Sequence, residues 1–240
     1  NVGKFFKKQG YKVFSSDILY LSYCLQKAYI ENNDEPCFKN LLEILPKQKS
    51  EIFFASPLDT VVNYLNSLDG IEGFIYKNYT PSGTVDLPRQ RMYFIDENGK
   101  KIDAIRLKIE EWKKENLISE DEYFILLACL IETIGFYSNV AGVYAAFYKS
   151  WDPRALKPFT MRTIQILNNN QQNIVYNDDS MNFINNIDVD ILYLDPPYNE
   201  RQYASNYHIL ETIAKYDEPE LHGITGMRNY TSQKSKFCNP

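Results

Sequence analysis

The sequence predicts an α/β fold in which an incomplete, Rossmann-like sheet is combined with a large, mainly helical inserted domain. Strand and helix patterns alternate only near the two ends of the 240-residue chain. Between them lies a long stretch with helical spacing and no such alternation. We therefore predict a discontinuous α/β domain, residues 1–30 and 165–240, and a helical insert, residues 31–164.

The composition is that of a globular protein and excludes several other classes. Hydrophobic residues make up 44% of the chain and charged residues 24%, so it is neither disordered nor fibrous. No apolar run is long enough to span a membrane. Four scattered cysteines without a metal-binding spacing predict a reducing, cytoplasmic location and no structural metal. The net charge of −5 confines any nucleic-acid site to a local basic region.

The first thirty residues have the pattern helix, strand, helix. Residues 4–9 are helical and stop at Gly10, residues 11–16 alternate like a strand, and residues 18–30 return to helical spacing. Asp17 directly follows the strand. An acid there either meets a ligand at the sheet edge or caps the next helix, and both interpretations stay open.

The insert contains recognisable helix starts. The segment that begins at Ser56 has a capping serine, a proline in the first turn and an acid three residues on. Residues 91–95 are a candidate strand, followed by an Asn98-Gly99 turn. A helix is expected over residues 102–115, and Ser119 caps the next one.

Strand patterns return toward the C-terminal end. Residues 174–176 form a short strand, which Asp179 follows, and residues 181–186 form a short helix. Residues 190–194 are a continuous apolar run, typical of a strand buried in a parallel sheet. Like Asp17, Asp179 is either a ligand-binding acid or a helix cap.

The buried run is followed by Asp195-Pro196-Pro197-Tyr198. Proline has no N–H, so the carbonyl groups beside Asp195 stay free as acceptors. A carboxylate and a free carbonyl suit an exocyclic amino group with two donors, and a tyrosine ring offers a stacking face to a flat base. Three acids at successive strand ends suit a nucleoside-bearing cofactor. A simple acid followed by a turn-forming Pro-Pro is the plainer alternative.

The strand ending on Asp17, the acid Asp179 and the run over residues 195–208 resemble the adenine-specific DNA methyltransferases of the Dam-like, restriction-modification type. The resemblance implies a methyltransferase sheet, S-adenosylmethionine as cofactor and a flipped adenine in double-stranded DNA as substrate. It also implies a cognate restriction endonuclease as candidate partner. By position it gives the catalytic motif as Asp195, Pro196, Pro197 and Tyr198, and the cofactor contacts as Asp17, Asp179, Val2 and Gly3.

The family's glycine-rich cofactor loop and its later strands have no counterpart between Asn1 and Pro240. We therefore expect a fragment, truncated at both ends. Direct in-line transfer of the methyl group is expected, because no Cys-His or Ser-His pair accompanies the motif. His208, within a predicted helix, is expected to have a structural role.

DNA contacts are expected mainly from the insert. Between residues 138 and 163, four basic side chains and several aromatic ones accompany one acid, Asp152, which suits phosphate binding beside the cleft. The residues after the motif are further candidates, and a solvated surface is the alternative throughout. The candidates are Lys149, Arg154, Lys157, Arg162, Arg201, Gln202 and Tyr203, with a second basic cluster at Arg89, Arg91, Lys100 and Lys101.

Other functions remain open at this point. Methyltransferases for RNA bases or protein amides usually carry Asn at the first motif position, so Asp195 favours adenine in DNA. Methylation of the cytosine amino group uses the same acceptor chemistry. A catalytically silent DNA-binding subunit of the same fold is a different class of protein, and the intact motif argues against it.

Overall fold

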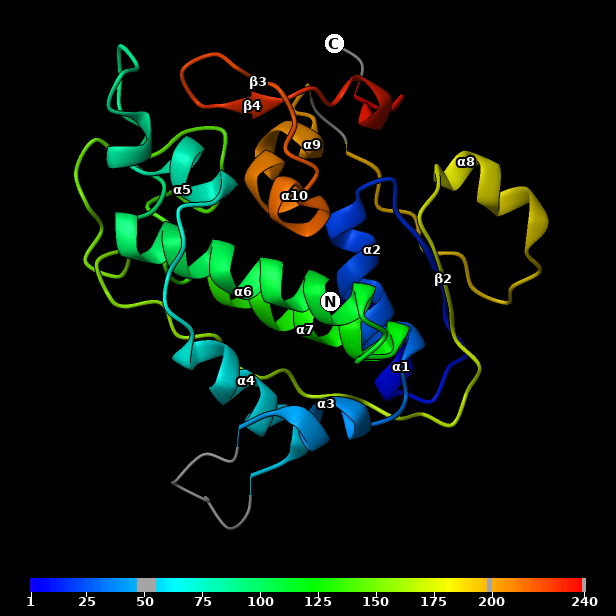
Figure 1. Cartoon of the computed structure of the whole chain (residues 1–240). Helices are drawn as coiled ribbons and strands as arrows, with labels where there is room; N and C mark the ends of the chain where they lie inside the picture. The colour runs from blue at the N-terminus through cyan, green and yellow to red at the C-terminus, as the bar shows by residue number, and fades with distance from the viewer. Residues whose placement is uncertain (47–54, 198–199, 239–240) are drawn as a thin grey trace.

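The computed structural model describes residues 1–46, 55–197 and 200–238 (Figure 1). Helices dominate this part of the chain, and the strands form two small sheets, which agrees with the predicted α/β class in its coarse form. The helices are α1 (Val2–Lys8), α2 (Tyr20–Gln26) with the π-helical turn η1 (Lys27–Glu31), α3 (Lys39–Ile44), α4 (Pro57–Ser67), α5 (Phe74–Tyr79), α6 (Asp96–Lys114), α7 (Glu120–Ile134), α8 (Ser180–Phe183), α9 (Tyr203–Asn206) and α10 (His208–Lys215). Short 3₁₀ turns cover Ser82–Thr84, Ile184–Asn186 and Thr231–Gln233.

The main core surrounds α7, which is buried along most of its length. This helix packs against α2, α6 and α10, and Figure 1 shows α6 and α7 side by side below α10. The core runs from Leu19 to Ala214 and includes side chains from both predicted domains. The two parts therefore share one core, and their separation into domains stays a prediction.

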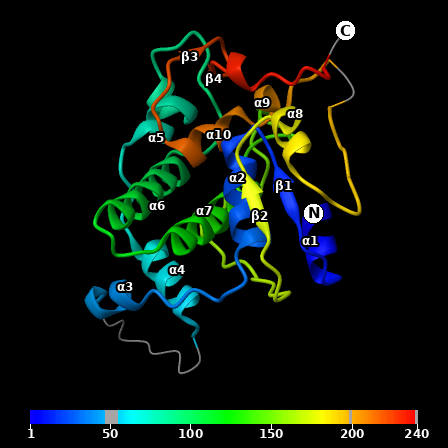
Figure 2. The same ribbon diagram turned by 90° about the vertical axis from the view of Figure 1, so that its right-hand side faces the viewer.

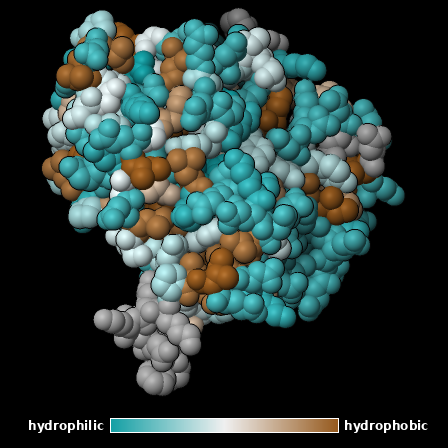
Figure 3. Space-filling view, in the orientation of Figure 1, coloured by the Kyte–Doolittle hydropathy of each residue, from teal (hydrophilic) through white to brown (hydrophobic). Residues whose placement is uncertain are grey.

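The surface follows the usual pattern for such a core. On the face in Figure 3, apolar side chains form separate small patches among hydrophilic ones. Among the described residues, no helix combines the length and apolar character that crossing a bilayer requires.

Two helix starts were predicted correctly from local sequence. The Ser56 hydroxyl accepts a hydrogen bond from the Asp59 amide at the start of α4, and the Ser119 hydroxyl accepts one from the Glu122 amide at the start of α7. In each case the acid also accepts from the backbone of its serine, which completes a reciprocal capping box.

The parallel sheet consists of β1 (Phe14–Ser16) and β2 (Ile174–Tyr176), which lie side by side in Figure 2. Phe14 is opposite Ile174, and Ser16 is opposite Tyr176. A small second core, Val13, Ile30 and Val175, supports this pair. Both strands agree with the sequence prediction, although β1 is shorter than the predicted span.

The prediction of a buried strand over residues 190–194 is wrong for this structure. The segment has no strand pairing, and Ile191, Leu192, Tyr193 and Leu194 are 56, 51, 56 and 62% exposed. A strand must pair its N–H and C=O groups with a neighbour, and no described strand lies beside this run. The run is apolar enough to be buried in a sheet, but within the described residues it is exposed and unpaired.

The predicted strand over residues 91–95 and the turn at Asn98-Gly99 are also wrong. Residues 91–95 are irregular, because buried side chains such as Tyr93 and Phe94 fix them instead of a ladder. Asn98 and Gly99 lie inside α6. A side chain at position 99 would lie 2.4 Å from the methyl group of Thr80, so glycine here allows close packing.

The hairpin of β3 (Leu221–His222) and β4 (Met227–Arg228) is fixed to the helices by Arg91. The buried Arg91 guanidinium donates to the carbonyl oxygens of Asn78, Gly223 and Ile224. The Tyr79 hydroxyl donates to Gly226 O at 2.9 Å. Gly226 has φ +67°, and a Cβ atom there would lie 2.7 Å from the guanidinium carbon.

Residues 135–173 contain no helix or strand, and between residues 148 and 161 asparagine side chains hold their backbone. Each of these side chains accepts a backbone N–H of the segment and donates to a backbone C=O, and we call them the asparagine brackets. They are Asn139 (to Asp152 N and Tyr148 O), Asn98 (to Phe159 N and Lys157 O) and Asn66 (to Met161 N and O).

Candidate functional site

The parallel pairing of β1 and β2 brings two of the predicted acids to one edge of the sheet. The Asp17 amide donates to Tyr176 O at 3.2 Å, and the Asn177 side chain donates to Asp17 O at 2.9 Å. Ser16 Oγ donates to Asp178 O at 2.8 Å. The chain segments that carry Asp17 and Asp179 are thus tied together where the two strands end, as the sequence predicted.

Both acids accept a hydrogen bond from the backbone amide two residues further on, and the bond of Asp179 caps α8. Asp17 Oδ1 accepts from Leu19 N at 2.8 Å, and Asp179 Oδ1 accepts from Met181 N at 3.0 Å. Burial raises the pKa of Asp17, the Leu19 amide and the Ser22 hydroxyl oppose this, and the charge of Glu211 raises it further. The capping interpretation is therefore satisfied at Asp179, whereas Asp17 precedes Leu19, the N-cap residue of α2, and does not cap that helix. Each carboxylate still has acceptor capacity at the strand ends.

The predicted catalytic motif lies on the unpaired segment after residues 190–194. Asp195 is exposed, Pro196 and Pro197 are half-buried, and Tyr198 lies outside the described residues. The side chain of Gln202 accepts from Ser235 N at 2.8 Å and donates to Ser235 O at 3.3 Å. Arg201 and Tyr203, the neighbours of Gln202, are both exposed.

Of the two predicted cofactor contacts in α1, Gly3 is engaged in packing and Val2 is exposed. A Cβ atom at Gly3 would lie 2.8 Å from Ile30 Cδ1, so glycine allows α1 to approach η1 closely. Val2 is 37% exposed.

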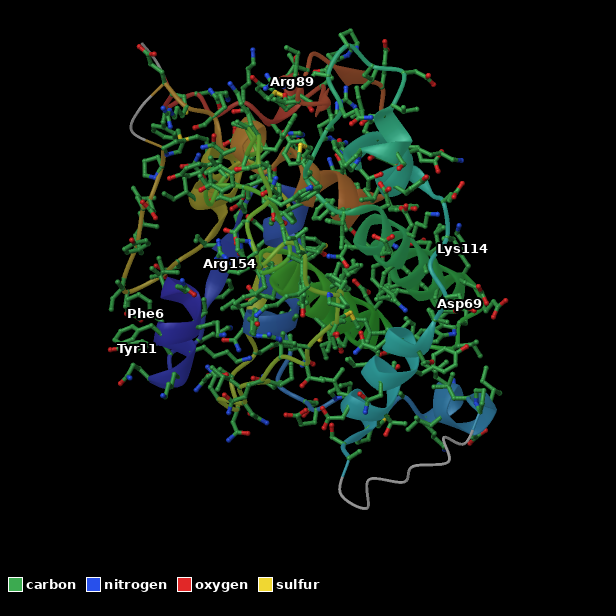
Figure 4. All side chains as sticks on the ribbon, turned by 90° about the vertical axis from the view of Figure 1, so that its left-hand side faces the viewer. Phe6, Tyr11, Asp69, Arg89, Lys114 and Arg154 are labelled. Atoms are coloured by element: carbon green, nitrogen blue, oxygen red, sulfur yellow. The ribbon has the colours of Figure 1, made fainter. Side chains whose placement is uncertain are left out.

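The four basic candidates of the insert are all exposed on the irregular segment: Lys149, Arg154, Lys157 and Arg162. Arg154, labelled in Figure 4, forms an ion pair with Asp152 at 2.7 Å and lowers the pKa of that acid to about 2. The Arg162 guanidinium lies 4.8 Å from the centre of the Phe136 ring. Apart from Arg154, these side chains form no ion pair within the described part of the chain, so their charges are available to phosphates.

The second basic cluster belongs mostly to the fold, which corrects the prediction. Arg91 is buried against carbonyl groups, Lys100 pairs with Glu72 at 2.7 Å, and Lys101 donates to Leu68 O. Arg89 is exposed at the edge of the molecule (Figure 4).

His208 is structural, as expected. It is fully buried beside the rings of Tyr79 and Tyr93, and its Nε2 lies 2.9 Å from Tyr144 O. Burial lowers its pKa to about 4, so the ring is neutral near pH 7.

Sequence reasoning missed Glu211, which joins three distant segments. Its carboxylate is 1% exposed and accepts from Tyr20 N, Leu21 N and the side chain of Gln233. The available signal was an acid within the otherwise buried helix α10. Across the described ranges, no cluster of three or more His, Cys, Asp or Glu side chains is arranged to hold a metal ion.

Acids at the ends of paired parallel strands, followed by an Asp-Pro-Pro-Tyr motif, define a helix-rich α/β protein with the elements of a methyltransferase. The chain belongs to the D12 class N6 adenine-specific DNA methyltransferase family, whose profile matches residues 2–240. The match confirms the resemblance drawn from the motifs.

Several restriction-modification enzymes are similar to this chain. It is 47% identical over 237 residues to the type II methyltransferase M.FokI of Planomicrobium okeanokoites and 40% identical over 238 residues to the modification methylase StsI of Streptococcus sanguinis. Each match covers 99% of this chain and 34% of the relative, so the chain spans about a third of their length. Identity to M.NlaIII of Neisseria lactamica is 41% over 239 residues, or 99% of this chain and 64% of that protein. No solved structure matches.

Proposed function

We propose that the protein transfers a methyl group from S-adenosylmethionine to the exocyclic amino group of an adenine flipped out of double-stranded DNA. Its role would be that of the modification enzyme in a restriction-modification system, with a cognate endonuclease as partner. The observation that carries the proposal is the adenine-methyltransferase family match over residues 2–240, which includes the intact motif at Asp195.

The acceptor groups at the strand ends fit the cofactor. Ribose hydroxyls and an adenine amino group are hydrogen-bond donors, and they need acceptors such as the carboxylates of Asp17 and Asp179. The pairing of β1 with β2 supports this assignment, because it keeps the two acids at the same edge. The bound cofactor supplies an electrophilic methyl group on a sulfonium. Val2 and Gly3 are proposed as further contacts by resemblance.

The motif residues would prepare the target nitrogen. Its lone pair is delocalised into the adenine ring, which makes it a weak nucleophile. Asp195 and the carbonyl group of Pro196 would accept its two hydrogens and direct the lone pair toward the methyl group. Tyr198 is proposed to stack on the flipped base, because a base cannot be reached inside the duplex.

The same proposal gives the protein a Rossmann-like methyltransferase sheet, with the paired strands β1 and β2 as part of it. Asp17 and Asp179 would then lie at the carboxyl edge of that sheet, where open α/β sheets bind their ligands.

DNA binding is assigned to the insert and to the residues after the motif. Exposed Lys149, Lys157 and Arg162, together with Arg154, would contact phosphates without reading sequence. Arg201, Gln202 and Tyr203 follow the motif directly and would lie near the flipped nucleotide. Target recognition within the insert, residues 31–164, belongs to the same proposal.

The test compares Asp195→Ala with Asp190→Ala in the whole protein. Both changes remove an exposed acid from the same segment, but only Asp195 is proposed to touch the reacting nitrogen. Transfer of a labelled methyl group to duplex DNA should fall about a hundredfold or more in Asp195→Ala and stay near normal in Asp190→Ala. Near-normal transfer by Asp195→Ala, or N4-methylcytosine as the product, would contradict the proposal.

A further inference from the structure

Glu211 is a buried carboxylate without a role in the proposed chemistry. It lies on α10, shortly after the predicted catalytic motif, and is 1% exposed. A buried charge is stable only when it is well hydrogen-bonded, and Glu211 has several partners. They are Tyr20 N at 3.1 Å, Leu21 N at 2.8 Å, Gln233 Nε2 at 2.6 Å and Lys215 Nζ at 3.0 Å.

The two backbone partners belong to the first turn of α2. That helix has no side-chain cap of its own, so Glu211 supplies the cap from a position about 190 residues away in the sequence. The preceding amide, Leu19 N, donates to Asp17 at 2.8 Å. Three successive N–H groups are thus shared between Asp17 and Glu211, and the orientation of one carboxylate depends on the other.

The C-terminal segment closes the same network. Gln233 also lies 3.5 Å from Ile18 O, next to Asp17. Two residues further on, Ser235 is held by the side chain of Gln202, which follows the motif. The structure therefore connects the strand end at Asp17 with both segments that follow Asp195.

We propose that Glu211 is a positioning residue: by fixing the first turn of α2, it holds Asp17 in the orientation that binds the cofactor. The inference rests on the proposed function, because it takes Asp17 as the cofactor acid. Glu211 itself touches neither cofactor nor substrate. Its effect should appear in cofactor affinity and not in the affinity for DNA.

The matched control is Asp103 on α6. This buried carboxylate caps α5 in the same way, through Ile75 N at 2.9 Å, Tyr76 N at 2.8 Å and the Tyr216 hydroxyl at 2.5 Å. These three partners belong neither to α2 nor to the strand end at Asp17. Glu211→Gln and Asp103→Asn therefore each remove one buried, helix-capping charge, but only the first acts beside the proposed cofactor acid.

The experiment measures binding of S-adenosylmethionine to the whole protein by calorimetry, together with duplex affinity and unfolding by urea. Glu211→Gln should weaken cofactor binding about tenfold or more, because a displacement of about 1 Å at a positioned group has large effects. Its duplex affinity should stay within about twofold of the parent. Asp103→Asn should reduce stability and leave cofactor affinity within about twofold.

Equal losses of cofactor affinity in both variants, or no loss in Glu211→Gln, would overturn the inference. If Glu211→Gln does not fold, Gln233→Ala decides the matter, since it removes one donor and keeps the carboxylate. Cofactor affinity should then fall about threefold or more, because the carboxylate loses one charge-assisted hydrogen bond and keeps its two amide partners. An unchanged value would overturn the inference. A parent protein that binds no S-adenosylmethionine would overturn both the inference and the proposed function.

Discussion

The two histidines of the chain offer a direct measurement of how burial controls charge. His208 is fully buried, its Nδ1 atom has no hydrogen-bond partner among the described residues, and Arg91 and Arg228 add positive charge nearby. His222 is exposed on the β3–β4 hairpin. We compare His208→Gln with His222→Gln, because glutamine carries an amide that can donate to Tyr144 O in place of the imidazole.

The expected change in unfolding free energy follows from the pKa of His208, which burial lowers from 6.5 to about 4. Above about pH 6.5 the ring is neutral in both states, and its full contribution to stability is present. Below that pH, His208 binds a proton in the unfolded chain, whereas the native imidazole stays neutral down to about pH 4. Stability is therefore lost on acidification, by about 1.4 kcal/mol at about pH 5.5 and about 3 kcal/mol in full.

Protonation of Asp103 changes the unfolding free energy in the opposite direction over a similar pH range. Burial raises its pKa from 3.8 to about 6, against the hydrogen bonds from Tyr216 and the α5 amides. Its native carboxylate therefore takes up a proton before the unfolded one does, so acidification through pH 6 adds stability. In the parent protein the two effects on the unfolding free energy oppose each other. The contribution of His208 is therefore measured by comparing variants.

The assay is urea unfolding followed by tryptophan fluorescence, at about pH 7.5 and pH 5.5. Relative to the parent, His208→Gln should gain about 1.4 kcal/mol of unfolding free energy between the two pH values. His222→Gln should show no such gain, because this side chain is exposed on the hairpin and lies outside the buried cluster around His208. An equal difference at both pH values in His208→Gln would refute the assignment of a buried, neutral ring.

Two further predictions concern the surface and the hairpin. Neutralising the four exposed basic residues of the insert should weaken binding to all duplexes and reduce the log–log salt slope by about 0.9 for each phosphate that the variant no longer binds. Neutralising exposed Lys77 and Lys114 should leave the slope unchanged, and an unchanged slope in the first variant would place the DNA surface elsewhere. Gly223→Ala should lower the unfolding free energy by about 1 kcal/mol, because φ is +68° there and nothing else is close. Gly226→Ala should lose at least about 1 kcal/mol more by displacing Arg91, and equal losses in chemical denaturation would exclude that clash. The four basic residues neutralised in the DNA-binding variant are Lys149, Arg154, Lys157 and Arg162.

Features that depend on neighbouring residues were predictable from the sequence. The capping boxes at Ser56 and Ser119 need only residues three positions apart, and both formed as expected. The acids Asp17 and Asp179 could also be placed, because the strands before them are short and clearly bounded. These predictions required no knowledge of distant contacts.

Features decided by distant contacts could not be predicted. Asn98 and Gly99 have the composition of a turn, but contacts with Thr80 and with residues 155–159 hold them inside α6. The cap that Glu211 provides for α2 is invisible to any analysis of local spacing. For residues 190–194, the apolar pattern indicates burial, but a strand also needs a neighbour, and the described residues provide none.

The asparagine brackets have a consequence for how this protein can change. Asn139, Asn98 and Asn66 bind backbone groups of the segment, and buried side chains such as Phe159 also hold it, so its path does not depend on the exposed side chains. Exposed positions between the brackets can therefore be replaced without loss of shape. A surface built in this way can exchange one set of contacts for another while the helices beneath it stay the same.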